Sequence, residues 1–325
     1  MRFIIEPENG GMTIKEFLRR EAGPSRKLLN LTKNKPDGIL INGARMTVRY
    51  ILKPGDVLDF NYETAATGAP PKNDSLLDLI EIAYEDDYIL CVNKPPDMPS
   101  HPSFNHLDDT LANAVAAHYF RQNKTLKFHP VNRLDKDTSG LVLIAKDKLI
   151  SAKMNALIKN GEIKKVYSAI VTRDFCGIQT AEINTRLAQI NGAFEYDRET
   201  GTGRITAPVK RARDSIIKRV CAPDGDYSVT DFKFIKSNGA ISRLEVYPQT
   251  GRTHQIRVHF HAVGAPLLGD GLYTDTGTAA GYNIKRHALH AKSLEFVHPV
   301  SKSNIKIECG LPEDMKKIIE LIENS

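Results

Sequence analysis

The sequence predicts an α+β protein, in which a mixed, largely antiparallel sheet forms the main domain and a small α/β domain precedes it. Short apolar runs are separated by tight turns such as Asn42-Gly43 and Asn238-Gly239, which are typical of hairpins. A few helical stretches lie among them without the regular strand–helix alternation of a parallel sheet. Residues 63–75 combine small residues with paired prolines and predict a linker. We therefore expect domains at 1–62 and 76–325.

Composition is that of an ordinary folded protein with an excess of positive charge. The 325 residues are 41% hydrophobic and 26% charged, and 45 Lys and Arg against 39 Asp and Glu give a net charge of +6. This excess suits a polyanionic partner without requiring one. The start of the chain resembles no signal peptide and no apolar run is long enough to span a membrane, so we expect a cytoplasmic protein. Scattered cysteines argue against a zinc knuckle or ribbon: Cys91, Cys176, Cys221 and Cys309.

The first domain is predicted to contain two short helices and a few strands. Thr13 precedes an amphipathic stretch, 14–21, and Pro24-Ser25 opens a second helix that continues through Leu31. A strand at 38–43 ends in the Asn42-Gly43 turn. Another strand, at 57–60, follows a Pro-Gly-Asp turn.

Basic side chains cluster in the helical part of this domain. They form either a solvated helix surface or a surface that binds nucleic acid. Two basic helices followed by "ILING" and "LKPGDVLDF" resemble the S4 RNA-binding domain over residues 12–60. This resemblance implies RNA contacts by Arg19, Arg20, Arg26, Lys27, Lys33 and Lys35.

The main domain alternates strand and helix signals irregularly. Thr110 is a helix N-cap and Gly161 is a helix stop. We expect strands at 80–84, 88–92, 166–171, 229–236, 240–247 and 305–307, and helices at 111–122, 149–160 and 312–323.

The most informative segment is 129–140, which places Arg133, Asp135, Asp137 and two hydroxyl residues directly before the apolar strand 141–145. A carboxylate held this close to a core strand can serve as a nucleophile, a base or an ion-pair partner. A simple turn is the alternative, because Asp, Thr, Ser and Gly are common turn residues.

Two later segments also carry polar groups beside apolar ones. Tyr167 lies in an apolar strand, where a tyrosine is ordinarily a core residue. A helix at 253–263, after the turn at Gly251, would place His254, Arg257 and His261 on one face.

Together these segments resemble the RluA-type pseudouridine synthases, a family that includes large-subunit ribosomal RNA pseudouridine synthases. The family signature, His-Arg-Leu-Asp-x-x-Thr-Ser-Gly before an apolar strand, matches residues 132–140 except that Asn132 replaces the histidine. The segments "YEDDYILCVNKPPDMPSHPS", "TGRTHQIRVH", "LLGDGLY" and "LHAKSLEFVHP" occur in family order, so the resemblance spans about Ile80 to Pro299. We take Asn132 as a structural substitution.

The resemblance implies that uracil is detached from its ribose at N1 and rejoined through C5, with Asp135 as the essential carboxylate. Burial would raise the pKa of such a carboxylate, by up to ~3–5 units when complete, so a fixed cation is needed to keep it ionised. Arg257 matches the family arginine that pairs with the aspartate, and Tyr167 matches the tyrosine that stacks on the flipped base and assists proton removal. Substrate contacts are implied for Arg133, Asn132, Thr138, Arg252, His254, Gln255 and Leu289.

We expect no cofactor, nucleotide or metal, an RNA partner and a monomeric enzyme. The target is expected in large-subunit ribosomal RNA, with transfer RNA as the alternative. Other function classes remain at this point: an aspartic protease around Asp137-Thr138-Ser139-Gly140, and a non-catalytic RNA-binding factor. A metal-dependent nuclease is a further rival, with ligands from His254, His259, His261 and His290.

Overall fold

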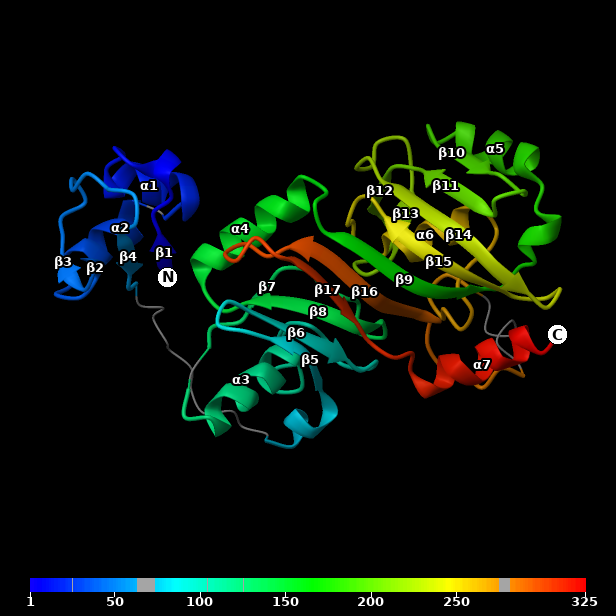
Figure 1. Ribbon diagram of the computed structural model, residues 1–325. Coiled ribbons are helices and arrows are strands. Elements are labelled where there is room, and N and C mark those ends of the chain that lie inside the picture. The colour runs from blue at the N-terminus through cyan, green and yellow to red at the C-terminus, as the bar shows by residue number, and fades with distance from the viewer. Residues whose placement is uncertain (25, 63–73, 104, 125, 275–280) are drawn as a thin grey trace.

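The computed structural model describes residues 1–24, 26–62, 74–103, 105–124, 126–274 and 281–325 (Figure 1). The predicted linker at 63–75 lies almost wholly outside these residues. Within them the α+β prediction is confirmed: an 11-stranded sheet in the main part of the chain is accompanied by helices, and a 4-stranded sheet lies near the N-terminus.

The N-terminal unit, residues 1–62, has its own sheet and core. Thr13 caps α1 through a capping box with Glu16, which is why the helix begins where the sequence predicts. At the predicted hairpin, Asn42 and Gly43 have φ of 52° and 81°. Buried apolar side chains from both helices and from the strands form one cluster. The elements are β1 (Arg2–Ile4), α1 (Ile14–Glu21), α2 (Arg26–Lys33), β2 (Ile39–Ile41), β3 (Ala44–Arg45) and β4 (Val57–Phe60), with strand order β1-β4-β2-β3.

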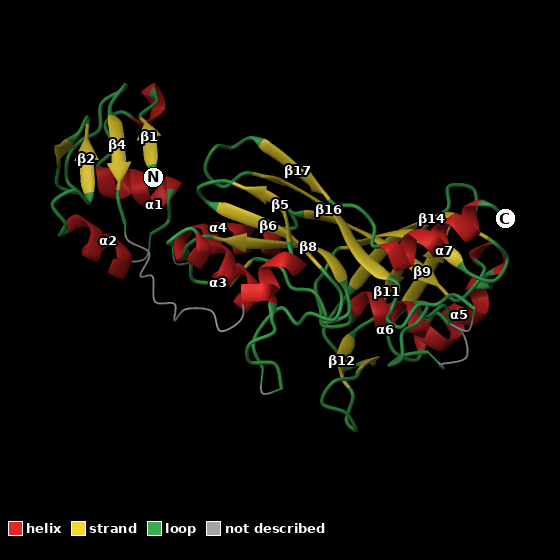
Figure 2. Cartoon of the chain, turned by 90° about the horizontal axis from the view of Figure 1, so that it is seen from below, coloured by secondary structure: helices red, strands yellow, loops and turns green. Residues whose placement is uncertain are grey.

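The large sheet has the order β10-β11-β14-β15-β9-β16-β8-β6-β5, with β17 paired to β16 and β7 to β8. Its neighbouring strands are antiparallel except for β16 and β8, which are parallel. A separate hairpin, β12 with β13, projects from the body (Figure 2). The strands are β5 (Glu81–Glu85), β6 (Ile89–Lys94), β7 (His129–Pro130), β8 (Ser139–Ala145), β9 (Lys164–Val171), β10 (Ala193–Tyr196), β11 (Thr202–Thr206), β12 (Val209–Arg211), β13 (Arg219–Cys221), β14 (Val229–Ser237), β15 (Ser242–Pro248), β16 (Leu289–Val297) and β17 (Asn304–Glu308).

Most predicted helices lie where their caps indicate, with one correction. The helix predicted at 253–263 begins only at Gln255, because His254 adopts a left-handed conformation with φ of 58°. His254 therefore precedes the helix instead of sharing its face with Arg257. The helices are α3 (Leu111–Arg121), α4 (Lys148–Lys159), α5 (Thr180–Ala188), α6 (Gln255–Ala262) and α7 (Glu313–Glu323), and short 3-10 turns lie at Pro7–Asn9, Asp74–Leu79 and Phe175–Gly177.

Strand β8 positions the segment that the sequence singles out. All of its residues are buried, and it lies between β6 and β16. Gly140 has a φ of +110°, and a Cβ there would lie 2.3 Å from the carbonyl oxygen of Ala291. Only glycine allows this approach of β8 to β16. The pairing brings the loop at 131–138 beside Leu289 at the start of β16.

The N-terminal unit contacts the main domain at the beginning of α4. The Tyr62 hydroxyl donates a hydrogen bond of 2.7 Å to Asp147. The Asp147 carboxylate also caps α4, because it accepts from the backbone amides of Leu149 and Ile150 in the first turn of the helix. Leu149, in that helix, is buried in the core of the N-terminal unit. Near the other end of α4, Ile158 lines a pocket together with Asp135 and Arg257.

Candidate active site

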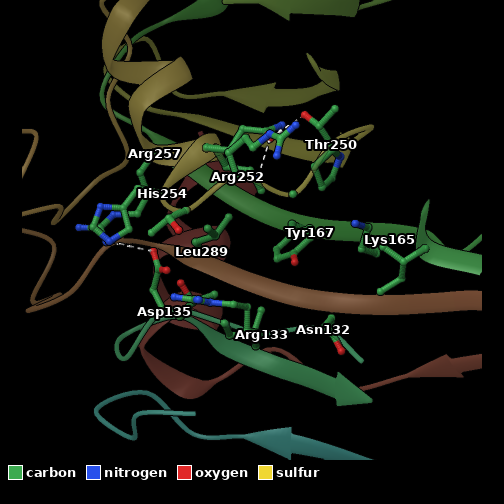
Figure 3. A pocket seen from close by; sticks show the side chains of 18 of the residues that line it. Asn132, Arg133, Asp135, Lys165, Tyr167, Thr250, Arg252, His254, Arg257 and Leu289 are labelled. Carbon is green, nitrogen blue, oxygen red and sulfur yellow. Dashed lines mark hydrogen bonds and ion pairs between the residues drawn. The ribbon is translucent and has the colours of Figure 1, made fainter. Parts of the chain in front are cut away.

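A pocket of about 200 Å³ forms where the loop at 131–138, strand β9 and the segment 250–257 meet (Figure 3). The geometry thus brings together segments that are more than a hundred residues apart in the chain. Every residue that the sequence predicts for catalysis or substrate contact lines this pocket: Asn132, Arg133, Asp135, Thr138, Tyr167, Arg252, His254, Gln255, Arg257 and Leu289.

Asp135 and Arg257 form the charged centre of the pocket. The Nη1 of Arg257 donates to Oδ2 of Asp135 at 3.1 Å, and the Asp135 side chain keeps 20% exposure. Arg257 also donates two hydrogen bonds of 2.8 Å to Asp270, which is fully buried. Burial opposes the charged guanidinium, yet the bonds and charges of Asp270 and then Asp135 raise the pKa of Arg257. The guanidinium is therefore a fixed cation shared by two carboxylates.

The sequence interpretation missed Asp270, although it lies inside the quoted segment "LLGDGLY". Burial alone would raise the pKa of this carboxyl group, but the hydrogen bonds and charge of Arg257 lower it. A bidentate contact fixes the plane of a guanidinium. Asp270 thus orients Arg257 so that its remaining nitrogen faces Asp135. The only local signal was a single acid among apolar and glycine residues.

His254 and Tyr273 complete the surroundings of Asp135. The Nε2 of His254 lies 3.7 Å from Oδ2 of Asp135, and its Nδ1 lies 3.0 Å from the Tyr273 hydroxyl. Burial lowers the pKa of His254 below its ordinary value of 6.5, despite the nearby Asp135. His254 is therefore mainly neutral at pH 7. The Tyr273 ring lies 5.2 Å from the guanidinium carbon of Arg257, within cation–π range.

Tyr167 is buried on β9 and lines the same pocket. Burial first, and then the charge of Asp135, raise the pKa of its hydroxyl. The group stays protonated at neutral pH, so it can donate a hydrogen bond but is poorly suited to take a proton as a tyrosinate. The raised pKa disfavours the proton-removal role that the resemblance implies, whereas the ring can still serve as a stacking surface.

Three of the predicted substrate contacts are engaged within the protein. The amide of Asn132 bridges the carbonyl of Leu141 and the amide of Leu143, at 3.0 and 2.7 Å, and so ties the loop to β8. The Thr138 hydroxyl lies 2.6 Å from a ring nitrogen of His287. The Gln255 amide bonds the backbone of β14 and the turn before α6. These groups shape the pocket, whereas Arg133 and Arg252 are exposed at its mouth.

Lys94 is another residue that was not predicted from the sequence. Its side chain holds the loop at 131–138 in place through hydrogen bonds. Its Nζ donates to the carbonyls of Pro95, Met98 and Lys136 at 2.8 to 2.9 Å. Burial lowers the pKa of Lys94 to about 7, while three carbonyl acceptors match the three donors of an ammonium group. Arg286 adds a bond of 3.0 Å to the carbonyl of Asp137. The backbone that directly follows Asp135 is therefore fixed.

The predicted RNA-binding residues lie apart from this pocket, on the N-terminal unit. Arg20 bonds Glu21 and Asn9. The side chain of Lys27 lies outside the described residues. The exposed members are Arg19 and Arg20 on α1 and Arg26 and Lys33 on α2, and the half-buried Lys35 follows α2.

The metal-nuclease alternative finds no support in the donor set. Among the residues that the structure describes, no three histidine, cysteine or carboxylate side chains come together as a metal site. His259 contacts Thr230 and the Ala207 carbonyl, and His290 contacts Ser139 and Cys309. The protease alternative, placed at Asp137, requires a second carboxylate beside it. Asp137 instead has the cations Lys94 and Lys136 as charged neighbours, and its carbonyl accepts a hydrogen bond from Arg286. In the described part of the chain, no helix is long and apolar enough to cross a membrane.

Comparison with known proteins identifies the family. The family model for RNA pseudouridylate synthase matches residues 88–262. The chain is 36% identical over 315 residues to the uncharacterized RNA pseudouridine synthase YjbO of Bacillus subtilis, covering 95% of this chain and 99% of the relative. It is 31% identical over 298 residues to ribosomal large subunit pseudouridine synthase D of Pseudomonas aeruginosa, covering 89% of this chain and 85% of the relative. The solved structure of human RNA pseudouridylate synthase domain containing 4 shares the fold, with a TM-score of 0.56 and 20% identity over 77% of this chain and 96% of that one. The chain therefore belongs to the RNA pseudouridylate synthase family of the RluA type and is an isomerase that acts on RNA.

Proposed function

We propose that this enzyme converts uridine to pseudouridine in large-subunit ribosomal RNA in the cytoplasm, with Asp135 as the catalytic carboxylate. The 3.1 Å contact between Asp135 and Arg257 on the wall of the pocket supports the assignment of Asp135 as the catalytic residue. The RNA class is supported by several relatives at about 30% identity that are named ribosomal large subunit pseudouridine synthase D.

The reaction makes limited demands on the protein. The N1–C1′ bond of uridine breaks, a C5–C1′ bond forms, the proton on C5 leaves and N1 gains one, so no electrons are exchanged with another reactant. Asp135 is partly exposed in the pocket and is paired with Arg257, which suits its carboxylate for attack on the sugar or base or for proton abstraction from the sugar. Tyr167 offers a ring face and Leu289 an apolar wall for the detached uracil.

The target base must leave its helix or loop to enter this pocket. Flipping a nucleotide costs a few kcal/mol, and least when the base is unpaired. Arg133 is exposed at the mouth of the pocket, two residues from Asp135. From this position it would contact a phosphate or occupy the space that the flipped base leaves. We infer that structured RNA with an accessible uridine is the preferred substrate.

We infer further that residues 1–62 are an S4-like RNA-binding domain and residues 76–325 the catalytic domain. The exposed Arg19, Arg26 and Lys33 supply charge that RNA phosphates would neutralise, and such contacts weaken steeply as salt rises. The contact of this unit with α4 connects it to the domain that contains the pocket.

The test is to map pseudouridines in total RNA from cells with and without the gene, using carbodiimide-dependent primer-extension stops. The proposal expects at least one stop in large-subunit ribosomal RNA to disappear on deletion and to return when the wild-type gene is restored. Loss of a stop only in transfer RNA would assign the enzyme to that substrate instead and would contradict the ribosomal assignment.

A further inference from the structure

Lys165 lies at the junction of the active-site pocket with a second cavity. It precedes Tyr167 by two residues on β9, so the two side chains project from the same face of the strand. Figure 3 shows both beside the pocket. The second cavity, of about 630 Å³, shares Ile158, Lys165 and Pro248 with the pocket. An RNA strand that has one nucleotide in the active-site pocket can continue past Lys165 into the second, larger cavity.

The other lysines of the second cavity have carboxylate partners. Lys164 lies 2.9 Å from Glu295, Lys292 lies 2.9 Å from Glu245, and Lys306 lies 2.8 Å from Glu308. The side chain of Lys165 makes no hydrogen bond or ion pair with the described residues. It is half-buried, and burial lowers its pKa with no neighbouring acid to offset the effect.

An ammonium group removed from water without a partner is unfavourable, so such a group beside a pocket indicates a ligand that supplies the missing anion. The substrate carries such anions in its phosphates. In the proposed function, the base and ribose of the target uridine occupy the pocket beside Asp135 and Tyr167. Lys165 lies further along β9, at the junction with the second cavity. Lysine is a compact point charge on a flexible stem, which suits a phosphate better than a uracil edge.

We propose that Lys165 binds the backbone phosphate adjoining the target uridine, at the point where the RNA strand leaves the pocket. The inference rests on the proposed placement of the base between Asp135 and Tyr167. It makes Lys165 a substrate-positioning residue that holds the nucleotide from its backbone while Asp135 reacts with it.

The first measurement compares Lys165→Met with wild type, using as probe total RNA from cells that lack the gene. A lost charge-assisted contact predicts a decrease of about ten- to hundredfold in kcat/KM. It also predicts that the dependence of log kcat/KM on log salt becomes shallower by roughly 0.7, the value for one single-strand phosphate contact. Lys165→Arg should recover most of the activity. Lys233→Met, an exposed lysine on β14 that lines neither cavity, is the matched control and should stay within about twofold of wild type.

The second measurement separates a ligand site from a structural role. Because Lys165 has no partner among the described residues, Lys165→Met should leave the unfolding temperature of the RNA-free protein unchanged or raised. Unchanged kcat/KM, an unchanged salt dependence, or a lowered unfolding temperature in Lys165→Met would each overturn the proposal. If wild type modifies only transfer RNA in the same sample, the ribosomal assignment fails while the comparison of Lys165 variants still applies.

Discussion

The active-site pocket and the N-terminal unit both present positive charge, but they hold it in opposite ways. Arg257 is buried and fixed by two carboxylates, with hydrogen bonds of 2.8 to 3.1 Å. Arg19 and Arg26 are exposed on short helices. A buried, oriented charge can stabilise one arrangement of reacting atoms, whereas exposed charges add attraction for a polyanion with little geometric demand. Substitutions in the pocket should therefore impair chemistry, whereas substitutions on the N-terminal unit should impair affinity.

Among the substitutions that alter these positive charges, the largest effect is expected for Arg257→Lys. A lysine cannot contact Asp270 and Asp135 together in the plane that the guanidinium provides, so kcat/KM should decrease by about 10²–10³. The buried pair with Asp270 is also weakened, and the free energy of unfolding should decrease by about 1–3 kcal/mol. Single-turnover rates and denaturant titrations measure the two quantities. Asp270→Asn is the companion variant, because it leaves Asp135 intact and only loosens Arg257. Turnover near wild type in Arg257→Lys would refute the ion-pair account.

The second expected effect is a loss of folding stability as the pH falls. Burial lowers the pKa of His259 and His290 to about 4 and that of His287 to about 3, so these residues stay neutral in the folded protein. Unfolded histidines bind protons below pH 6.5, so stability is present above that pH and is lost as pH falls from 6.5 towards 4. Each residue contributes a loss of about 1.4 kcal/mol per pH unit. The N-terminal unit has no histidine and lacks this contribution.

Denaturant unfolding at pH 7.5 and 5.5 measures this loss. His259→Gln should make the difference between the two pH values smaller by roughly 1 kcal/mol. Equal acid sensitivity in wild type and His259→Gln would show that His259 is not held neutral.

The smallest effect is expected on the N-terminal unit. Arg19→Ala combined with Arg26→Ala should weaken RNA binding by about two- to tenfold at moderate salt, and the effect should fade as salt rises. The rate of the bound complex should not change, because neither side chain is near the pocket. Filter binding at several salt concentrations measures this. Lys317→Ala on α7, at the other end of the molecule in Figure 1, is the control of equal charge type. A loss of the single-turnover rate in the double variant would contradict the separation of roles.

Local signals in the sequence predicted much of the fold. The Thr13 and Thr110 caps and the Asn42-Gly43 and Asn238-Gly239 turns act over a few residues, and the elements beside them lie close to their predicted bounds. The short strands β10 to β13 were not predicted, because three to five residues of mixed polarity give no clear period. The start of α6 was misplaced because a left-handed His254 has no signature in composition.

The pocket could be predicted only through the family resemblance, because its contacts are long-range. Asp135 and Arg257 are 122 positions apart, and nothing in either segment identifies the other as its partner. The supporting residues were not predicted for the same reason. Asp270 and Lys94 act through groups brought to them by the sheet, the first on Arg257 and the second on the carbonyls around the loop. Neither role can be recognised in a segment of sequence taken alone.

We expect Asp135 to perform chemistry and not merely to bind RNA. The single-turnover rate of Asp135→Asn with RNA in complex tests this most directly. The amide keeps the size of the side chain but cannot act as a nucleophile or base, so pseudouridine formation should decrease by at least about 10⁴. The affinity for RNA should remain within a few-fold of wild type. Pseudouridine formation by Asp135→Asn within about tenfold of the wild-type rate would contradict the account.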